Sequence, residues 1–123
     1  MTIALWCVLV AGILPQFFGI YAKASKDFDN NNPREYLARL EGKRARAVAA
    51  MANGYEGFPL FAAAVIIASM LKGPQFTTDM LALGYIATRI AYGVLYIAGK
   101  GTLRSVVWMA GLACIVTLFV KAM

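Results

Sequence analysis

The chain has 123 residues, of which 61% are hydrophobic and 15% charged, and its formal net charge is +6. So short a chain cannot bury this much apolar surface inside a water-soluble globule, which predicts a single domain embedded in a membrane. Most of the positive charge lies in one segment, where the positive-inside rule explains it better than nucleic acid, so we expect no nucleic-acid partner.

The first predicted element is an uncharged, apolar helix at residues 2–22. About 20 residues are enough to cross the hydrocarbon core of a bilayer. The tripeptide Ala22-Lys23-Ala24 is similar to a signal-peptide cleavage site, but the segment has no basic start and its apolar run is long for a signal peptide. We therefore expect a first transmembrane helix that is retained.

A second, longer helix is predicted at residues 33–71, after a polar connection that ends in DFDNNN. Asn32 is a good N-cap, and Pro33 suits the first helical position. An unbroken helix over this range would be about 58 Å long, longer than a bilayer is thick. Its charged first third should project into the aqueous phase, and Pro59 should kink it within the membrane.

Two further membrane helices are predicted at residues 78–98 and 102–120, with Thr78 and Thr102 as their N-caps. The sequence thus predicts an all-α fold, an integral membrane four-helix bundle over residues 1–123. One side of the bundle is rich in basic residues, which are Lys23, Lys26, Arg34, Arg39, Lys43, Arg44, Arg46, Lys100 and Arg104. The opposite side has only Lys72 and Lys121, so the positive-inside rule predicts both termini outside the cytoplasm.

Polar residues interrupt the apolar pattern of the second predicted helix. Arg46, Asn53 and Glu56 fall on one side of it, because seven residues make about two helical turns. An ionised carboxylate next to lipid tails costs at least a few kcal/mol, so we expect this polar stripe to face protein or water. Asn53 is expected to form a hydrogen bond to another helix.

The third predicted helix carries Arg89 on the same face as Tyr85, Tyr92 and Tyr96. One interpretation is a structural ion pair between Arg89 and Glu56, with the tyrosines packing around it. Such a pair is also compatible with the floor of a polar cleft.

Arg104 begins the fourth predicted helix close to the basic side of the bundle. It is either an anchor for anionic lipid headgroups or part of a pocket for a small anion. In the second case it would lower the pKa of a substrate thiol, and Tyr92 and Tyr96 would donate hydrogen bonds to the anion. The chain has no histidine, so no metal site is expected, and Cys7 and Cys114 are expected to be packing residues rather than a disulfide.

Two motifs resemble those of the MAPEG family, the membrane-associated proteins in eicosanoid and glutathione metabolism. The run Asn53-x-x-Glu56-x-Phe58-Pro59-Leu60-Phe61 is similar to the family's second-helix signature. The spacing Arg89-x-x-Tyr92-x-x-x-Tyr96, followed by Leu103-Arg104-Ser105, is similar to its third and fourth helices. The resemblance spans essentially the whole chain and points to a bacterial-type member.

The resemblance implies a homotrimer that binds glutathione between subunits. The implied glutathione-binding residues are Asn53, Glu56, Arg89, Tyr92 and Tyr96, and Arg104 is the implied catalytic arginine that activates the thiol. Family enzymes usually carry an arginine at the position of Ala49, and here Ala49-Ala50-Met51 stands in its place. Arg46, one turn earlier, is the candidate substitute.

The sequence therefore favours a glutathione-dependent transferase or peroxidase of a bacterial inner membrane that acts on apolar electrophiles. The alternative is a non-catalytic membrane protein that binds lipid or a small anionic metabolite in the same cleft, as the missing arginine indicates. A small multidrug transporter is a third hypothesis, but such transporters place an essential acid in their first helix, and residues 2–22 contain none.

Overall fold

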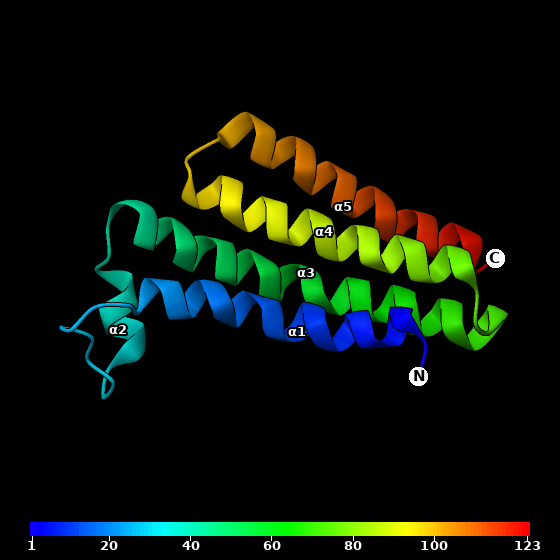
Figure 1. Cartoon of the computed structure of the whole chain (residues 1–123), viewed down its shortest axis with the longest axis horizontal. Helices are drawn as coiled ribbons and strands as arrows, with labels where there is room; N and C mark the ends of the chain where they lie inside the picture. Colours follow the sequence, from blue (N-terminus) through cyan, green and yellow to red (C-terminus); the bar gives the residue numbers. More distant parts are fainter.

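The computed structural model describes all 123 residues, Met1–Met123, and contains helices but no strand. Four of its helices are long and apolar enough to cross a membrane. They run side by side with both chain termini at one end of the bundle, and a short helix with its flanking loop lies at the other end (Figure 1). This arrangement confirms the predicted all-α membrane bundle. The helices are α1 (Ile3–Ala22), α2 (Pro33–Ala38), α3 (Gly42–Lys72), α4 (Phe76–Ile97) and α5 (Gly101–Lys121).

The helix predicted at residues 33–71 is broken in two, so the prediction of one unbroken helix was wrong. The chain leaves the helical conformation after Ala38 and re-enters it at Gly42. Gly42 has a φ of +66°, a left-handed conformation that glycine adopts without a steric penalty. The break turns α2 away from the axis of α3 (Figure 1), so residues 33–41 do not continue the membrane helix, whereas the last part of the charged segment, residues 42–46, forms the start of α3.

Two predicted N-caps were also wrong. The N-cap of α4 is Gln75 and that of α5 is Lys100, which leaves Thr78 and Thr102 inside their helices. Thr78 is buried, whereas Asp79 in the same turn reaches across to α1, where its carboxylate accepts a hydrogen bond from the backbone N–H of Ala4 at 2.9 Å. This contact satisfies one of the free N–H groups at the start of α1.

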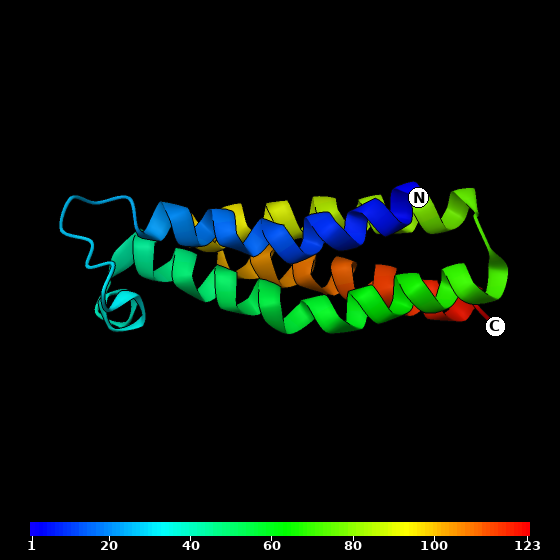
Figure 2. The same cartoon turned by 90° about the horizontal axis from the view of Figure 1, so that it is seen from below.

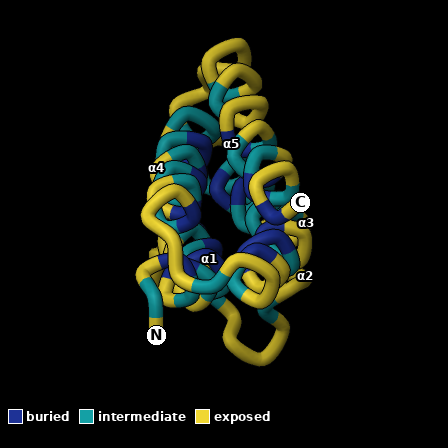
Figure 3. The backbone as a smooth tube through the Cα atoms, turned by 90° about the vertical axis from the view of Figure 1, so that its right-hand side faces the viewer, coloured by how far each residue is buried: buried dark blue, intermediate teal, exposed yellow.

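The core lies along the bundle axis, where buried residues of the four long helices face one another (Figure 3). α1 packs mainly on α3 and α5 mainly on α4, and contacts of α4 with α1 and α3 join the two pairs. Small residues allow this close packing: Ala4, Ala11, Ala64 and Ala82 are buried around Phe61. Figure 2 shows α3 bending near the middle of its length, in the part that contains Pro59.

Two arginines near the start of α3 join it to the ends of neighbouring helices. The Nε group of Arg44 donates a hydrogen bond to the carbonyl of Ala22, the last residue of α1, at 2.9 Å. The Nε group of Arg46 donates to the carbonyl of Ile97, the last residue of α4, at 3.0 Å. Both contacts satisfy carbonyls that a helix end leaves without partners.

The connection between α1 and α2 is held by a chain of polar contacts, which we call the loop cluster: Ser25, Asp27, Tyr36 and Arg44. Arg44 donates to the hydroxyl of Tyr36 at 2.6 Å, and that hydroxyl donates to the carboxylate of Asp27 at 2.9 Å. Ser25 donates to the same carboxylate. The hydrogen bonds from Ser25 and Tyr36 lower the pKa of Asp27.

Candidate functional site

Two adjoining pockets lie between α3, α4 and α5. The inner pocket has a volume of about 220 Å³ and is lined by Asn53, Glu56, Gly57, Leu60, Tyr85, Arg89, Trp108, Gly111, Leu112 and Ile115. The outer pocket has a volume of about 420 Å³ and is lined by Asn53, Tyr92, Arg104, Ser105, Trp108 and Met109. Asn53 and Trp108 line both, so the two pockets form one cleft. The outer pocket is nearer the basic end of the bundle, because Arg104 lies only three residues after the start of α5.

Arg89 is the buried cation of this cleft, with 9% of its surface exposed. Its Nη2 group donates a hydrogen bond to the amide oxygen of Asn53 at 2.7 Å. The predicted hydrogen bond between Asn53 and another helix is therefore confirmed, but the predicted ion pair between Arg89 and Glu56 was wrong. Asn53 and Glu56 are three residues apart, which points their side chains about 60° away from each other, and only Asn53 meets α4. Since an amide carries no net charge, the positive charge of Arg89 is not neutralised.

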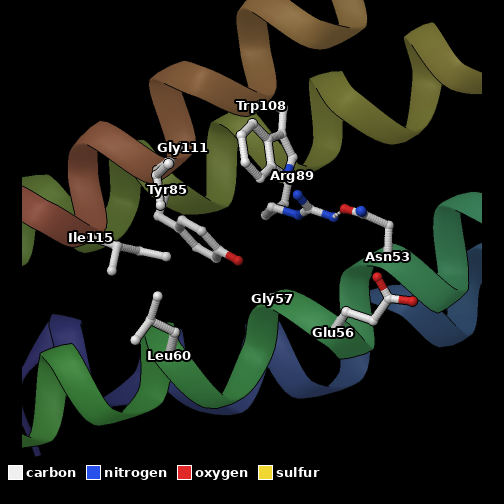
Figure 4. A pocket seen from close by; sticks show the side chains of 10 residues that line it. Asn53, Glu56, Gly57, Leu60, Tyr85, Arg89, Trp108, Gly111 and Ile115 are labelled. Atoms are coloured by element: carbon white, nitrogen blue, oxygen red, sulfur yellow. Dashed lines mark hydrogen bonds between the residues drawn. The ribbon is translucent and has the colours of Figure 1, made fainter.

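Glu56 lies at the rim of the inner pocket and is exposed on the surface of the single chain. Figure 4 shows its carboxylate near Asn53, on the side of the pocket away from Leu60 and Ile115. The predicted inward-facing polar stripe is thus divided, with Asn53 partly buried and Glu56 at the surface. A carboxylate at this depth of a membrane requires protein or water around it.

In the outer part of the cleft, the side chains of two arginines lie against the rings of two tyrosines. The guanidinium carbon of Arg89 lies 4.5 Å from the centre of the Tyr92 ring, and that of Arg104 lies 4.2 Å from the Tyr96 ring and 6.0 Å from Tyr92. The two rings meet edge to face at 5.7 Å. These are cation–π contacts, which orient a guanidinium group without neutralising its charge. Neither arginine forms an ion pair, since the chain's one ion pair joins Glu35 and Arg39 at the surface.

Arg46 is the one candidate that the fold separates from the rest. It lines neither pocket, because its Nε group is bonded to the end of α4. Met51, which stands near the position of the missing family arginine, lies against Gly19 of α1. Of its charged and amide side chains, α3 therefore contributes Asn53 and Glu56 to the cleft and no arginine.

Tyr85 and Trp108 line the cleft but were not among the predicted site residues. Tyr85 had been placed on the face of Arg89 only as a packing residue. Trp108 comes four residues after Arg104, so it shares the cleft face of α5. The spacing of Tyr85 from Arg89 and of Trp108 from Arg104 could therefore have identified both as residues that line the cleft. No group of three or more His, Cys, Asp or Glu side chains is arranged to hold a metal ion.

Four helices long and apolar enough to cross a membrane, three of which line a cleft with two arginines that form no ion pair, define a multi-pass membrane protein with a polar site. The family model of the MAPEG family matches residues 3–123, essentially the whole sequence, and the chain belongs to this family. This match confirms the resemblance carried by the motifs of α3 and α4. The family includes glutathione transferases and peroxidases as well as non-catalytic members. Comparison with curated proteins and with solved structures gives no match.

Proposed function

We propose that this protein is a membrane-bound transferase or peroxidase that uses glutathione or another small anionic thiol and acts on apolar electrophiles that reach the cleft from the bilayer. The observation that carries the proposal is the pair of arginines without ion-pair partners, Arg89 and Arg104, in one cleft. An anion entering the cleft gains the attraction of both charges and displaces no carboxylate from either of them.

The residues present fit the charges of glutathione, which has two carboxylates, one ammonium group and a thiol. Arg89 and Arg104 suit the anionic groups, and the exposed carboxylate of Glu56 suits the ammonium group. Tyr92 and Tyr96 lie beside the arginines and have hydroxyl donors. When bound, glutathione supplies the nucleophilic sulfur, and the chain's own groups bind and orient it.

Arg104 is the residue that we assign to thiol activation. A free thiol with a pKa of about 8.5 is roughly 3% ionised at pH 7. An opposite charge in close contact lowers a pKa by about 1–3 units, and a decrease of one unit raises the ionised fraction to about 24%. Arg104 would therefore increase the amount of the attacking thiolate without accepting or donating a proton itself.

We further propose that the protein is a homotrimer in a bacterial inner membrane, with both termini outside the cytoplasm. Glu56 supports self-association, because its exposed carboxylate would otherwise face lipid. The basic end, with the loop cluster and Lys100, supports the orientation through the positive-inside rule. Accessibility of a cysteine introduced at Lys26 to an impermeant maleimide in intact cells tests the orientation: no labelling is expected until the cells are opened.

Calorimetric titration of glutathione into the purified protein tests the central proposal. Saturable binding is expected for the parent and for Arg34→Ala, a matched control on α2 outside the cleft, and loss of binding is expected for Arg89→Ala. Arg104→Ala should retain some binding, but its bound thiol should titrate at a higher pH by ultraviolet absorbance. Absence of binding at millimolar glutathione, or an unchanged thiol titration in Arg104→Ala, would count against the proposal.

The alternative function is non-catalytic binding of lipid or a small anionic metabolite in the same cleft. The engagement of Arg46 with the end of α4 favours it, because α3 then offers no second cation for a glutathione carboxylate. Acceleration of thiol addition to any electrophile above the uncatalysed rate, lost in Arg104→Ala, would exclude this alternative.

A further inference from the structure

We propose that the inner pocket is a binding site for a small, uncharged, largely apolar carbonyl compound, such as a ketone or a quinone, whose oxygen accepts a hydrogen bond from the hydroxyl group of Tyr85. The proposed function assigns the thiol to Arg104 and the outer pocket, and it assigns the charged ends of glutathione to Arg104 and to Arg89 and Glu56 on the polar side of the inner pocket; it gives Tyr85 no role. Identifying the carbonyl compound as the acceptor of the thiol rests on the proposed function, whereas its binding does not.

Tyr85 is held rigidly with its hydroxyl group in the pocket. Only 3% of the residue is exposed, and its ring is stacked on Phe61 with the centroids 4.1 Å apart. Figure 4 shows the hydroxyl pointing into the open part of the pocket, toward Gly57. A Cβ atom at Gly57 would lie 3.0 Å from the hydroxyl oxygen, so the glycine keeps the space beside the hydroxyl open.

The hydroxyl of Tyr85 has no hydrogen-bond partner within the protein. The side-chain bonds in this part of the cleft join Arg89 to Asn53 and Thr88 to the backbone carbonyl of Tyr85, and neither uses the hydroxyl. No buried side-chain nitrogen or oxygen atom of the chain lacks a partner, so this hydroxyl oxygen is open to the pocket, where an acceptor atom of a ligand can reach it. The free donor points to a ligand with an acceptor oxygen.

The charges of the pocket favour an uncharged ligand. One cation, Arg89, and one carboxylate, Glu56, line it, so its formal net charge is zero. In the proposed function these two groups hold charged ends of glutathione, which leaves the part of the pocket around Tyr85, Leu60 and Ile115 without a free charged side chain. A charged ligand in that part would lose its hydration without an opposite charge beside it. A neutral carbonyl oxygen satisfies the hydroxyl of Tyr85 at a smaller desolvation cost.

The size and lining of the pocket limit the rest of the ligand. Leu60, Leu112 and Ile115 form its apolar side, and Trp108 lies over Arg89 at the other side (Figure 4). A cavity of about 150 Å³ lined by apolar residues holds benzene, so a volume of about 220 Å³ suits a single substituted ring. These features together describe a ring compound with a carbonyl oxygen at one end.

Tryptophan fluorescence can report binding, because Trp108 lines the pocket and Trp6, the other tryptophan, lies on α1. The probe is duroquinone, a fully methylated benzoquinone without a ring position that a thiol can substitute, added to the full chain in lipid nanodiscs without thiol. In Trp6→Phe, we expect saturable quenching of Trp108. In Trp108→Phe, quenching of Trp6 should follow the quinone concentration in the lipid without saturation, which gives the non-specific background.

Tyr85→Phe tests the hydrogen bond, since it removes only the hydroxyl and keeps the stack on Phe61. A neutral hydrogen bond predicts that the dissociation constant of duroquinone rises by about 3- to 10-fold. Tyr21→Phe, a change on α1 outside the pocket, should leave it unchanged. Durene, the hydrocarbon with the same four methyl groups and no oxygen, should displace duroquinone. The dissociation constant of durene obtained from this competition should be the same in the parent and in Tyr85→Phe. Leu60 is exposed, so Leu60→Phe can narrow the apolar side of the pocket without disturbing the core, and it should weaken the binding of both compounds.

Three results would overturn this inference: quenching of Trp108 that does not saturate, an unchanged affinity in Tyr85→Phe, or unchanged binding of both compounds in Leu60→Phe. If Tyr85→Phe does not fold, the Leu60→Phe and durene measurements decide the question. Because no thiol is present, failure here leaves the proposed function standing. Conversely, saturable duroquinone binding in a protein that does not bind glutathione would count against the proposed function and keep this site.

Discussion

Replacing Gly93 with alanine should destabilise the bundle, whereas the same replacement at Gly84 on the same helix should not. At Gly93, α4 lies so close to α1 that an added Cβ atom would overlap the ring of Phe18. At Gly84, the nearest atom to an added Cβ is the sulfur of Cys114 at 3.5 Å, an ordinary van der Waals distance. The two positions therefore differ in the room that they leave for a Cβ atom, although both lie inside the same helix.

The magnitude follows from a comparison of the two variants. Both exchange glycine for alanine inside a helix, which favours the helix by about 1 kcal/mol in each case. Overpacking costs about 1–3 kcal/mol, and this cost applies only at Gly93. The free energies of unfolding of Gly93→Ala and Gly84→Ala should therefore differ by about 1–3 kcal/mol. Gly93 follows Tyr92, so a displacement of α4 should also weaken anion binding in the outer pocket.

Unfolding in mixed micelles with increasing dodecyl sulfate, followed by circular dichroism, measures this difference. A second pair of variants in a Phe18→Ala background isolates the cause, because removal of the ring should also remove the difference between the two alanine variants. Equal stabilities of Gly93→Ala and Gly84→Ala, or a difference that persists without the Phe18 ring, would refute the close packing of Phe18 on Gly93.

Three further changes test individual contacts. Arg46→Ala should lower the free energy of unfolding by about 0.5–1.5 kcal/mol, measured in dodecyl sulfate, because the carbonyl of Ile97 loses its donor. Asn53→Ala should lower it by about 1–3 kcal/mol by leaving the guanidinium of Arg89 without its acceptor, and Asn53→Asp, which keeps an acceptor, should cost less. Acidification should open the loop cluster: the pKa of Asp27 is lowered, so its contribution is present above the ordinary pKa of about 3.9 and is lost as the pH falls through the lowered value. Amide hydrogen exchange of residues 23–36 between pH 5 and pH 2 measures this opening.

Each of these three predictions has a control or a comparison variant, and a result that would contradict it. Lys43→Ala, an exposed change on the same turn of α3, is the control for Arg46→Ala, and equal effects of the two would contradict the helix-end contact. Equal stabilities of Asn53→Ala and Asn53→Asp would contradict the hydrogen bond to Arg89. Tyr36→Phe removes one donor to Asp27 and should shift the opening of the loop to higher pH, so an unchanged profile would contradict the loop cluster.

Much of the candidate site could be predicted from residue spacing within single helices. Arg89, Tyr92 and Tyr96 share a face because they are separated by three and four residues, and the structure places them together. The partner of Arg89 could not be predicted in the same way. Asn53 and Glu56 were both reasonable partners in sequence, and the rotation of α3 about its axis, which depends on packing against α1 and α4, selected Asn53.

Arg46 shows the same limit. Its position one turn from Ala49 suggested a substitute for the missing arginine, but the end of α4 lies within reach of its guanidinium group and occupies its Nε donor. The free hydroxyl of Tyr85 likewise depends on a glycine of another helix, Gly57, which no pattern within α4 indicates.

The sequence by itself determined the class of the protein, the membrane, the four long helices and the family. These properties depend on the length and composition of continuous segments, because each residue of a helix adds a fixed rise of about 1.5 Å and the bilayer requires about 20 apolar residues. Only the tertiary structure decided which polar groups meet: Arg89 with Asn53, Arg46 with the end of α4, and the hydroxyl of Tyr85 with an open pocket. The physical reason is that a contact between two helices depends on how they are rotated and how far apart they lie. The packing of small residues throughout the bundle determines both the rotation and the distance.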